Sequence, residues 1–210
     1  MSLIKVVDIA HVRFSAPDLA QMQGFLDDFG LTTFKQDGRL YARARDGRPF
    51  VHVTEQGDPG FLAFGFRAAS VEDLDILAKA EGVAVEDTLE PGGGRVVRLT
   101  DPDGFRVEVV AGQAQTPCEG GPVDLPRNTA AHRNRLRETV RLTAGPAHVR
   151  RIGHGVLNVS DFRTSEAWYK ERFGFLTSDE VEAAKDVPLG AFMGAVRQTL
   201  TSLQSAIRFG

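Results

Sequence analysis

The sequence predicts an α+β protein in which βαβββ units pair into a curved mixed sheet with the helices outside. An apolar strand with one His, followed by an aromatic-rich helix and a Gly, occurs at residues 9–30 and again at residues 152–175. Short strand patterns separated by turn residues follow the first copy. The 210 residues are enough to bury a substantial core in one or two domains.

The repeated stretch makes His11 and His154 counterparts, each followed seven residues later by an aspartate, Asp18 or Asp161. Because a strand alternates faces, a His between apolar neighbours lies either in the core or on a concave inner surface. A hydrogen-bonded core histidine and a metal ligand are both compatible with this pattern. The repeat of the pattern favours the interpretation of these histidines as metal ligands.

The first unit begins with a strand over residues 6–14. Pro17 and Asp18 then indicate a helix start, and Gly30 indicates its end. Strands are expected over 31–35, 39–44 and 49–55, separated by Asp-Gly turns. We expect the helix to place four residues in the core, because they fall at helical spacing: Leu19, Met22, Leu26 and Phe29.

A second unit is predicted from the strand 61–66 onward. Residues 70–73 resemble a helix capping box, and Gly82 ends the helix that follows. Its apolar stripe consists of Leu74, Leu77 and Ala78. Strands are expected over 83–89, 95–100 and 105–110, with hairpin turns at 91–94 and 101–104.

The chain divides into a complete first module over residues 1–112, a linker over 113–147 and an incomplete second module over 148–210. Pro and Gly residues interrupt the linker. Its Arg-rich end, 127–151, has no aromatic residues for base stacking, which favours a solvated surface segment over a nucleic-acid site.

Composition excludes several classes of protein. A net charge of −3 argues against nucleic-acid or membrane-surface binding by the whole chain. No apolar run approaches the roughly 18 residues of a membrane span, and the first residues lack the pattern of a signal peptide, so we expect a cytoplasmic protein. The single Cys118 forms no internal disulfide and is interpreted as a bystander.

The second module is expected to open with a strand over 149–159 and a helix capped by Ser160 and ended by Gly174, followed by a strand over 175–182. Residues 194–210 contain no His, Asp or Glu. Their apolar residues predict an amphipathic helix instead: Val196, Leu200, Leu203 and Ile207. The module is therefore expected to be cut short or replaced.

The residues around His154 and the run from Asp101 to Glu108, Asp-Pro-Asp-Gly followed by a strand with one Glu, resemble the vicinal oxygen chelate superfamily. This superfamily comprises glyoxalases, bleomycin-resistance proteins and type I extradiol dioxygenases. The resemblance covers about residues 6–112 and 148–193. It implies paired βαβββ modules and a divalent metal ion held by His and Glu.

The resemblance also implies how ring cleavage would depend on the second module. Type I extradiol dioxygenases hold Fe(II) with two His and one Glu, usually in that module. Carried over, His154 is the first ligand, whereas the other two positions are missing. The resemblance therefore implies an extradiol ring-cleavage dioxygenase-like protein, an oxidoreductase of aromatic catabolism, that is catalytically impaired.

The first module offers its own candidate ligands, His11, His52 and Glu108, one on each of three predicted strands. Two His and one carboxylate suit Fe(II), Mn(II) or Zn(II) equally well. Alternatively, the three residues are remnants of a concave ancestral binding site, or they form a hydrogen-bonded trio inside a non-catalytic module.

Two classes of function remain open at this stage. One is the dioxygenase-like enzyme, and the other is a metal-free binding module for a small aromatic molecule. A half module would expose a sheet edge and an apolar face, which favours a homodimer over a helix folding back.

Overall fold

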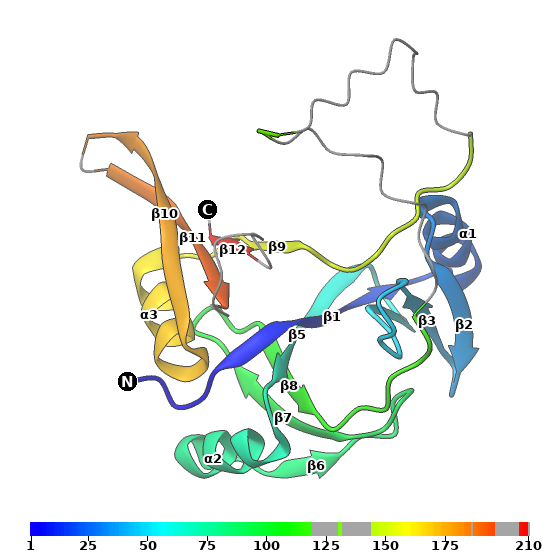
Figure 1. The fold of residues 1–210 in the computed structure, drawn as a ribbon, viewed down its shortest axis with the longest axis horizontal. Helices are drawn as coiled ribbons and strands as arrows, with labels where there is room; N and C mark the ends of the chain where they lie inside the picture. Colours follow the sequence, from blue (N-terminus) through cyan, green and yellow to red (C-terminus); the bar gives the residue numbers. More distant parts are fainter. Residues whose placement is uncertain (119–129, 132–143, 186, 196–205, 210) are drawn as a thin grey trace.

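The computed structural model describes residues 1–118, 130–131, 144–185, 187–195 and 206–209. Helices α1 (Leu19–Phe29), α2 (Val71–Glu81) and α3 (Phe162–Phe173) lie outside two sheets (Figure 1). The strands of the first sheet are β1 (Val6–Ala16), β2 (Thr32–Gln36), β3 (Arg39–Arg43), β4 (His52–Gln56), β5 (Gly60–Ala68), β6 (Val85–Asp87), β7 (Arg95–Thr100) and β8 (Arg106–Ala111). The strands of the second sheet are β9 (His154–Leu157), β10 (Phe175–Ala184), β11 (Val187–Ala195) and β12 (Ala206–Phe209).

The first sheet has eight strands in the order β2-β3-β4-β1-β5-β8-β7-β6. In each half the opening strand lies parallel to the fourth strand, β1 to β4 and β5 to β8. The two halves join through the antiparallel pair β1–β5. The predicted fold class, paired βαβββ units in a curved mixed sheet with helices outside, is confirmed.

The β1–β5 pairing is symmetric about one position. Val12 lies opposite Phe64, and on either side His11 lies opposite Gly65 and Arg13 opposite Ala63. Along the sequence, Val12 precedes its helix cap, Asp18, by the same number of residues as Phe64 precedes its own cap, Ser70. The two units are thus related by an approximate twofold axis between β1 and β5.

Helix boundaries follow the capping residues closely. The Asp18 side chain accepts hydrogen bonds from the backbone N–H groups of Ala20 and Gln21, and Gly30 ends α1 with a left-handed φ of 100°. The capping box at Ser70 and Asp73 is present as predicted. For α3 the expected cap was Ser160, but the structure places Asp161 there, accepting from the amides of Arg163 and Thr164.

The core prediction for α1 holds only in part. Leu26 is buried, and Leu19 and Met22 pack partly buried against it. Phe29 is 56% exposed and stacks on Phe25 at the outer end of the helix. Helical spacing places Phe29 near the apolar stripe, but its side chain stays largely outside the core.

The second sheet has the order β10-β11-β12-β9, with β12 parallel to β9 as β4 is to β1. Together with α3, these four strands form a third βαβββ unit. The predicted amphipathic helix is wrong at Ile207, which lies in β12, while Val196, Leu200 and Leu203 lie outside the described residues. Spacing alone did not reveal that β9 offers the last segment a strand to pair with.

The two sheets share one core. Phe66 of β5 packs against Tyr169, Phe173 and Phe175 of the third unit. The Asp101–Gly104 turn is also part of this contact, because the Asp101 carboxylate accepts a 3.0 Å hydrogen bond from the Tyr169 hydroxyl. Polar turn and aromatic core together hold the third unit against the first module.

Most of the predicted linker lies outside the described residues, and Cys118 at its start is exposed. Within the described ranges, no helix is both long enough and apolar enough to cross a membrane.

Candidate functional site

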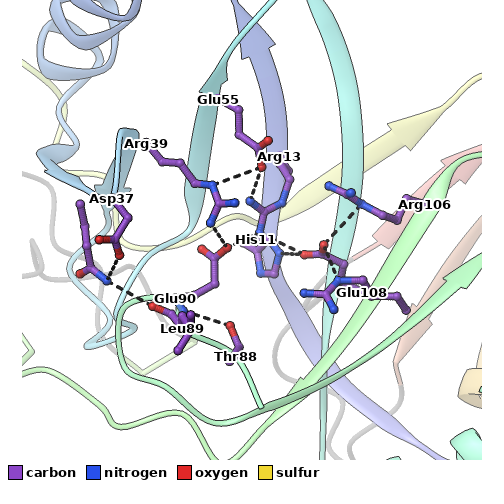
Figure 2. A network of polar contacts seen from close by, with 12 residues as sticks. His11, Arg13, Asp37, Arg39, Glu55, Thr88, Leu89, Glu90, Arg106 and Glu108 are labelled. Carbon is purple, nitrogen blue, oxygen red and sulfur yellow. Dashed lines mark hydrogen bonds and ion pairs between the residues drawn. The ribbon is translucent and has the colours of Figure 1, made fainter. Parts of the chain in front are cut away.

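The inner face of the first sheet forms a charged cup. The cavity has a volume of about 250 Å³. Strands β1, β3, β4, β7 and β8 contribute Arg and Glu side chains to it, and the segment after β6 contributes Glu90. Figure 2 shows Arg13, Glu90 and Glu108 of this set. Its lining is Arg13, Arg39, Glu55, Asp87, Thr88, Leu89, Glu90, Arg98, Arg106 and Glu108.

His11 and Glu108 meet at the base of this cup. The Nε2 atom of His11 lies 2.8 Å from Oε2 of Glu108, and both side chains are buried. Because an ionised carboxylate only accepts, the imidazole N–H is the donor. The structure thus brings together two of the predicted metal ligands, joined directly to each other.

Gly65 makes room for the His11 ring. A Cβ atom at this position would lie 2.5 Å from two atoms of the imidazole, closer than side-chain contacts allow. The Gly65→Ala variant should therefore be destabilised by roughly 1–3 kcal/mol, as overpacked cores are. Urea unfolding followed by circular dichroism measures this, with Gly24→Ala, where a Cβ meets no atom within 4 Å, as the matched control. Equal stability of the two variants would show that the ring is free to move.

Arg13 occupies the middle of the cup. Its guanidinium binds Glu55 at 2.7 Å, Glu90 at 2.9 Å and Glu108 at 3.3 Å. Its side chain is only 4% exposed. Arg39 contributes a further 3.3 Å contact to Glu90 from the rim. A buried guanidinium held by three carboxylates is a fixed cation inside the cup.

Neighbouring charges in the cup shift the pKa values of Glu108 and Arg13. Burial by itself would raise the pKa of Glu108, but the hydrogen bond from His11 and the charges of His11, Arg13 and Arg106 outweigh it and lower that pKa to about 2. Burial would lower the pKa of Arg13, yet Glu108 and Glu90 raise it overall. The carboxylate is therefore ionised and the guanidinium charged throughout the neutral range.

His52 points elsewhere. Its Nε2 lies 2.7 Å from the Thr54 hydroxyl, and its ring stacks on Phe14 at 5.5 Å. Burial, and then the neighbouring charge of His11, lower the pKa of His52 to about 4. The imidazole is therefore neutral at pH 7 and satisfied within its own strand.

These positions do not fit a metal ion. In the part of the chain that the structure describes, no three His, Cys, Asp or Glu side chains are grouped so that they could hold one. Glu108 is already matched by Arg13, with Arg98 and Arg106 3.6 Å and 3.4 Å away. A divalent cation would have to compete with these guanidinium groups, so the predicted set of His11, His52 and Glu108 is not assembled as a ligand set.

His154 lies apart from the charged cup. It is an exposed residue of β9 and lines an apolar cavity between the two sheets. On the strand beside it, the register position that His52 takes on β4 is taken by Ile207 on β12. The third unit therefore places one candidate ligand, and its parallel neighbour adds none.

The sequence analysis missed Arg13 although a signal was present. Arg13 lies two residues after His11, so strand alternation puts both on one face of β1. Glu90 carried no such signal, because it lies in a loop and reaches the cup only through the tertiary fold. A search for metal ligands alone considers only His and carboxylate side chains. It therefore overlooked Arg13, whose guanidinium neutralises the carboxylates of the cup.

Comparison with known proteins supports the fold independently. No protein-family model matches the sequence. Metapyrocatechase 2 of Cupriavidus necator is 26% identical over 191 residues, which cover 89% of this chain and 59% of that protein. The chain thus spans less than two thirds of this relative.

Solved structures show the same architecture. The Mn(II)-bound glyoxalase from Novosphingobium aromaticivorans matches with a TM-score of 0.72 and 20% identity, covering 99% of this chain and 63% of the other. The 2,3-dioxygenase LapB from Pseudomonas sp. KL28 matches with a TM-score of 0.73 and 19% identity, covering 99% and 71%. An extradiol ring-cleaving dioxygenase from B. fuscum gives 0.70 and 17%, covering 100% and 55%. The chain thus has the fold of the vicinal oxygen chelate superfamily, as its two motifs indicated.

Proposed function

We propose that this chain is an extradiol ring-cleavage dioxygenase-like protein that does not cleave catechols by itself. The similarity to metapyrocatechase 2 supports the reaction class. The observation that carries the second part is the position of His154, which has Ile207 rather than a second His at the matching place on β12. One candidate ligand is too few to hold a catalytic metal.

The first module has a supporting role in this proposal. Its cup contains a closed network of charges around Arg13 instead of an open ligand set. Such a network leaves neither His11 nor Glu108 available to bind a substrate. We assign no step of ring cleavage to these residues, and the module acts as a scaffold for the third unit.

A metal-free binding module is the second candidate. The cavity beside β9 has a volume of about 460 Å³ and is mainly apolar. Phe14, Phe61, Phe64 and Phe105 line it. A pocket of this size with aromatic walls suits a small aromatic molecule.

One experiment separates the two candidates. Protein loaded anaerobically with Fe(II) is mixed with 2,3-dihydroxybiphenyl in air, and the yellow ring-fission product is followed by absorbance. We expect no product above that of free iron, and less than one iron per chain after gel filtration. Equilibrium dialysis with the same diol, without metal, measures binding to the apolar cavity.

The outcomes are distinct. Product formation that His154→Ala abolishes would contradict the proposal, because it requires a complete metal centre. Saturable binding of the diol without iron would favour the binding module instead.

A further inference from the structure

The charged cup of the first module has an excess of positive charge. Four guanidinium groups line it, those of Arg13, Arg39, Arg98 and Arg106. Three carboxylates bind Arg13 inside it, those of Glu55, Glu90 and Glu108. Asp87 also belongs to the lining, but its side chain is 91% exposed and lies 3.7 Å from Arg95. Among the described residues, the interior of the cup therefore has one more guanidinium than it has carboxylates.

Arg106 is the guanidinium with the weakest contacts. Its Nε atom lies 3.4 Å from Oε1 of Glu108 without forming a hydrogen bond (Figure 2). Its two terminal nitrogens make no hydrogen bond or ion pair with any residue that the structure describes. Arg98, in contrast, donates at 2.7 Å to Glu86, which is not part of the lining. The terminal edge of Arg106 is thus free to bind a carboxylate through two parallel hydrogen bonds.

Two further polar atoms of the cup are buried without a partner in the described part of the chain. They are Nε of Arg13, whose side chain is 4% exposed, and Oε2 of Glu90, whose side chain is 11% exposed. Buried polar atoms are normally paired with protein, water or a ligand. A molecule that fills the cup therefore needs acceptors for the guanidinium groups and a donor for Glu90.

The free atoms lie close enough together for one small molecule. Nη2 of Arg13 contacts both Oε1 of Glu90, at 2.9 Å, and Oε2 of Glu108, at 3.3 Å. Arg106 lies next to Glu108 on the same strand face, and the cavity that all four side chains line has a volume of about 250 Å³. Arg106 and Glu90 are thus on opposite sides of a single small cavity.

We propose that the cup binds a small hydroxycarboxylate, with its carboxylate on Arg106 and its hydroxyl donating to Oε2 of Glu90. The single excess positive charge matches one carboxylate. Arg39 and Arg98 at the rim add a positive potential that attracts an anion. The site is separate from His154 and the apolar cavity, so the inference does not depend on whether the chain cleaves catechols.

Inorganic phosphate is the other small oxyanion with a hydroxyl group. In mildly alkaline solution it is largely a dianion, so it exceeds the charge that the cup leaves uncompensated. We therefore favour the carboxylate.

The first test is isothermal titration calorimetry of the intact protein with lactate at low ionic strength, where chloride competes least. We expect saturable binding, about fivefold weaker for propionate, which lacks the hydroxyl donor. Lactamide, which has no charge, should not bind. Arg106→Met should weaken lactate binding by about tenfold or more, because it removes the free guanidinium edge.

Arg95→Met is the matched control. It removes the same charge from an arginine of similar exposure that pairs with Asp75 of α2 and does not line the cup. Its affinity for lactate should equal that of the wild type. Circular dichroism and thermal unfolding confirm that both variants are folded.

A second measurement needs no variant. Phenylglyoxal modifies accessible guanidinium groups, and peptide mass spectrometry gives the rate at each arginine. Lactate should slow the modification of Arg106, whose side chain is 41% exposed, and leave that of Arg95, 37% exposed, unchanged.

Each other outcome overturns the proposal. No saturable binding of lactate, or equal binding of lactamide, would exclude an anion site. Equal affinity for propionate would remove the contact with Glu90, and phosphate that binds as tightly as lactate would assign the cup to oxyanions in general. An equal loss in Arg95→Met, or modification of Arg106 at the same rate with lactate present, would show that any binding takes place elsewhere.

Discussion

Replacing Arg13 by methionine should destabilise the protein by about 3–5 kcal/mol, because the change leaves buried carboxylates without their cation. Glu108 is 4% exposed and Glu90 is 11% exposed, so water cannot replace the guanidinium. Methionine has a similar length and fills the apolar part of the space. Urea unfolding at pH 7, followed by the fluorescence of the single Trp168, measures the loss in free energy of unfolding.

Arg95→Met is the control for Arg13. Arg95 pairs with the exposed carboxylates of Asp75 and Asp87 at 3.5 Å and 3.7 Å. Exposed pairs contribute about 0–1 kcal/mol, so this variant should remain close to wild type. An Arg13→Met protein as stable as Arg95→Met would mean that the network in the cup contributes no stability.

Stability should fall by about 3 kcal/mol between pH 7 and pH 4 through His52 alone. The unfolded chain protonates this imidazole near pH 6.5, whereas burial lowers its pKa in the folded protein to about 4. Between these values the unfolded state binds more protons, so the free energy of unfolding decreases as pH decreases. Glu108 adds a further loss only below about pH 4.5, because its lowered pKa stabilises the fold above that value.

The His52→Gln variant tests this dependence. An amide can still bond to the Thr54 hydroxyl but does not titrate, so its stability should vary much less between pH 6.5 and pH 4.5 than that of the wild type. His154→Gln, which changes an exposed histidine, should follow the wild type. All measurements contain a chelator, so that adventitious metal has no effect. A His52→Gln protein with the wild-type pH dependence would show that His52 is protonated in the fold.

The sequence predicted the parts of this protein that depend on neighbouring residues. Asp18, Ser70 and the glycines after each helix gave helix boundaries within a residue or two, because caps bind amides in the next turn. Short strand patterns separated by turn residues predicted the first two βαβββ units. The predicted cap of α3, Ser160, was wrong by one residue, because serine and the following Asp161 are both favourable N-cap residues.

The last strand needed tertiary information. Apolar residues spaced by three or four predict a helix, but the parallel neighbour β9 turns Ala206–Phe209 into a strand. Phe29 was assigned to the core from the same kind of spacing, although its side chain is 56% exposed. Local pattern does not reveal which neighbour a segment will have.

The candidate site shows the same division. The sequence by itself placed His11, His52 and Glu108 on strands of one sheet, and the structure brings His11 and Glu108, but not His52, into contact. Only the tertiary structure decided the chemistry, because Glu55 and Glu90 reach Arg13 across 42 and 77 residues and fix a guanidinium in the cup. Charged side chains interact when they are close in space, whereas a sequence pattern relates only residues that are close along the chain. The partners of Arg13 could therefore not be predicted from the sequence.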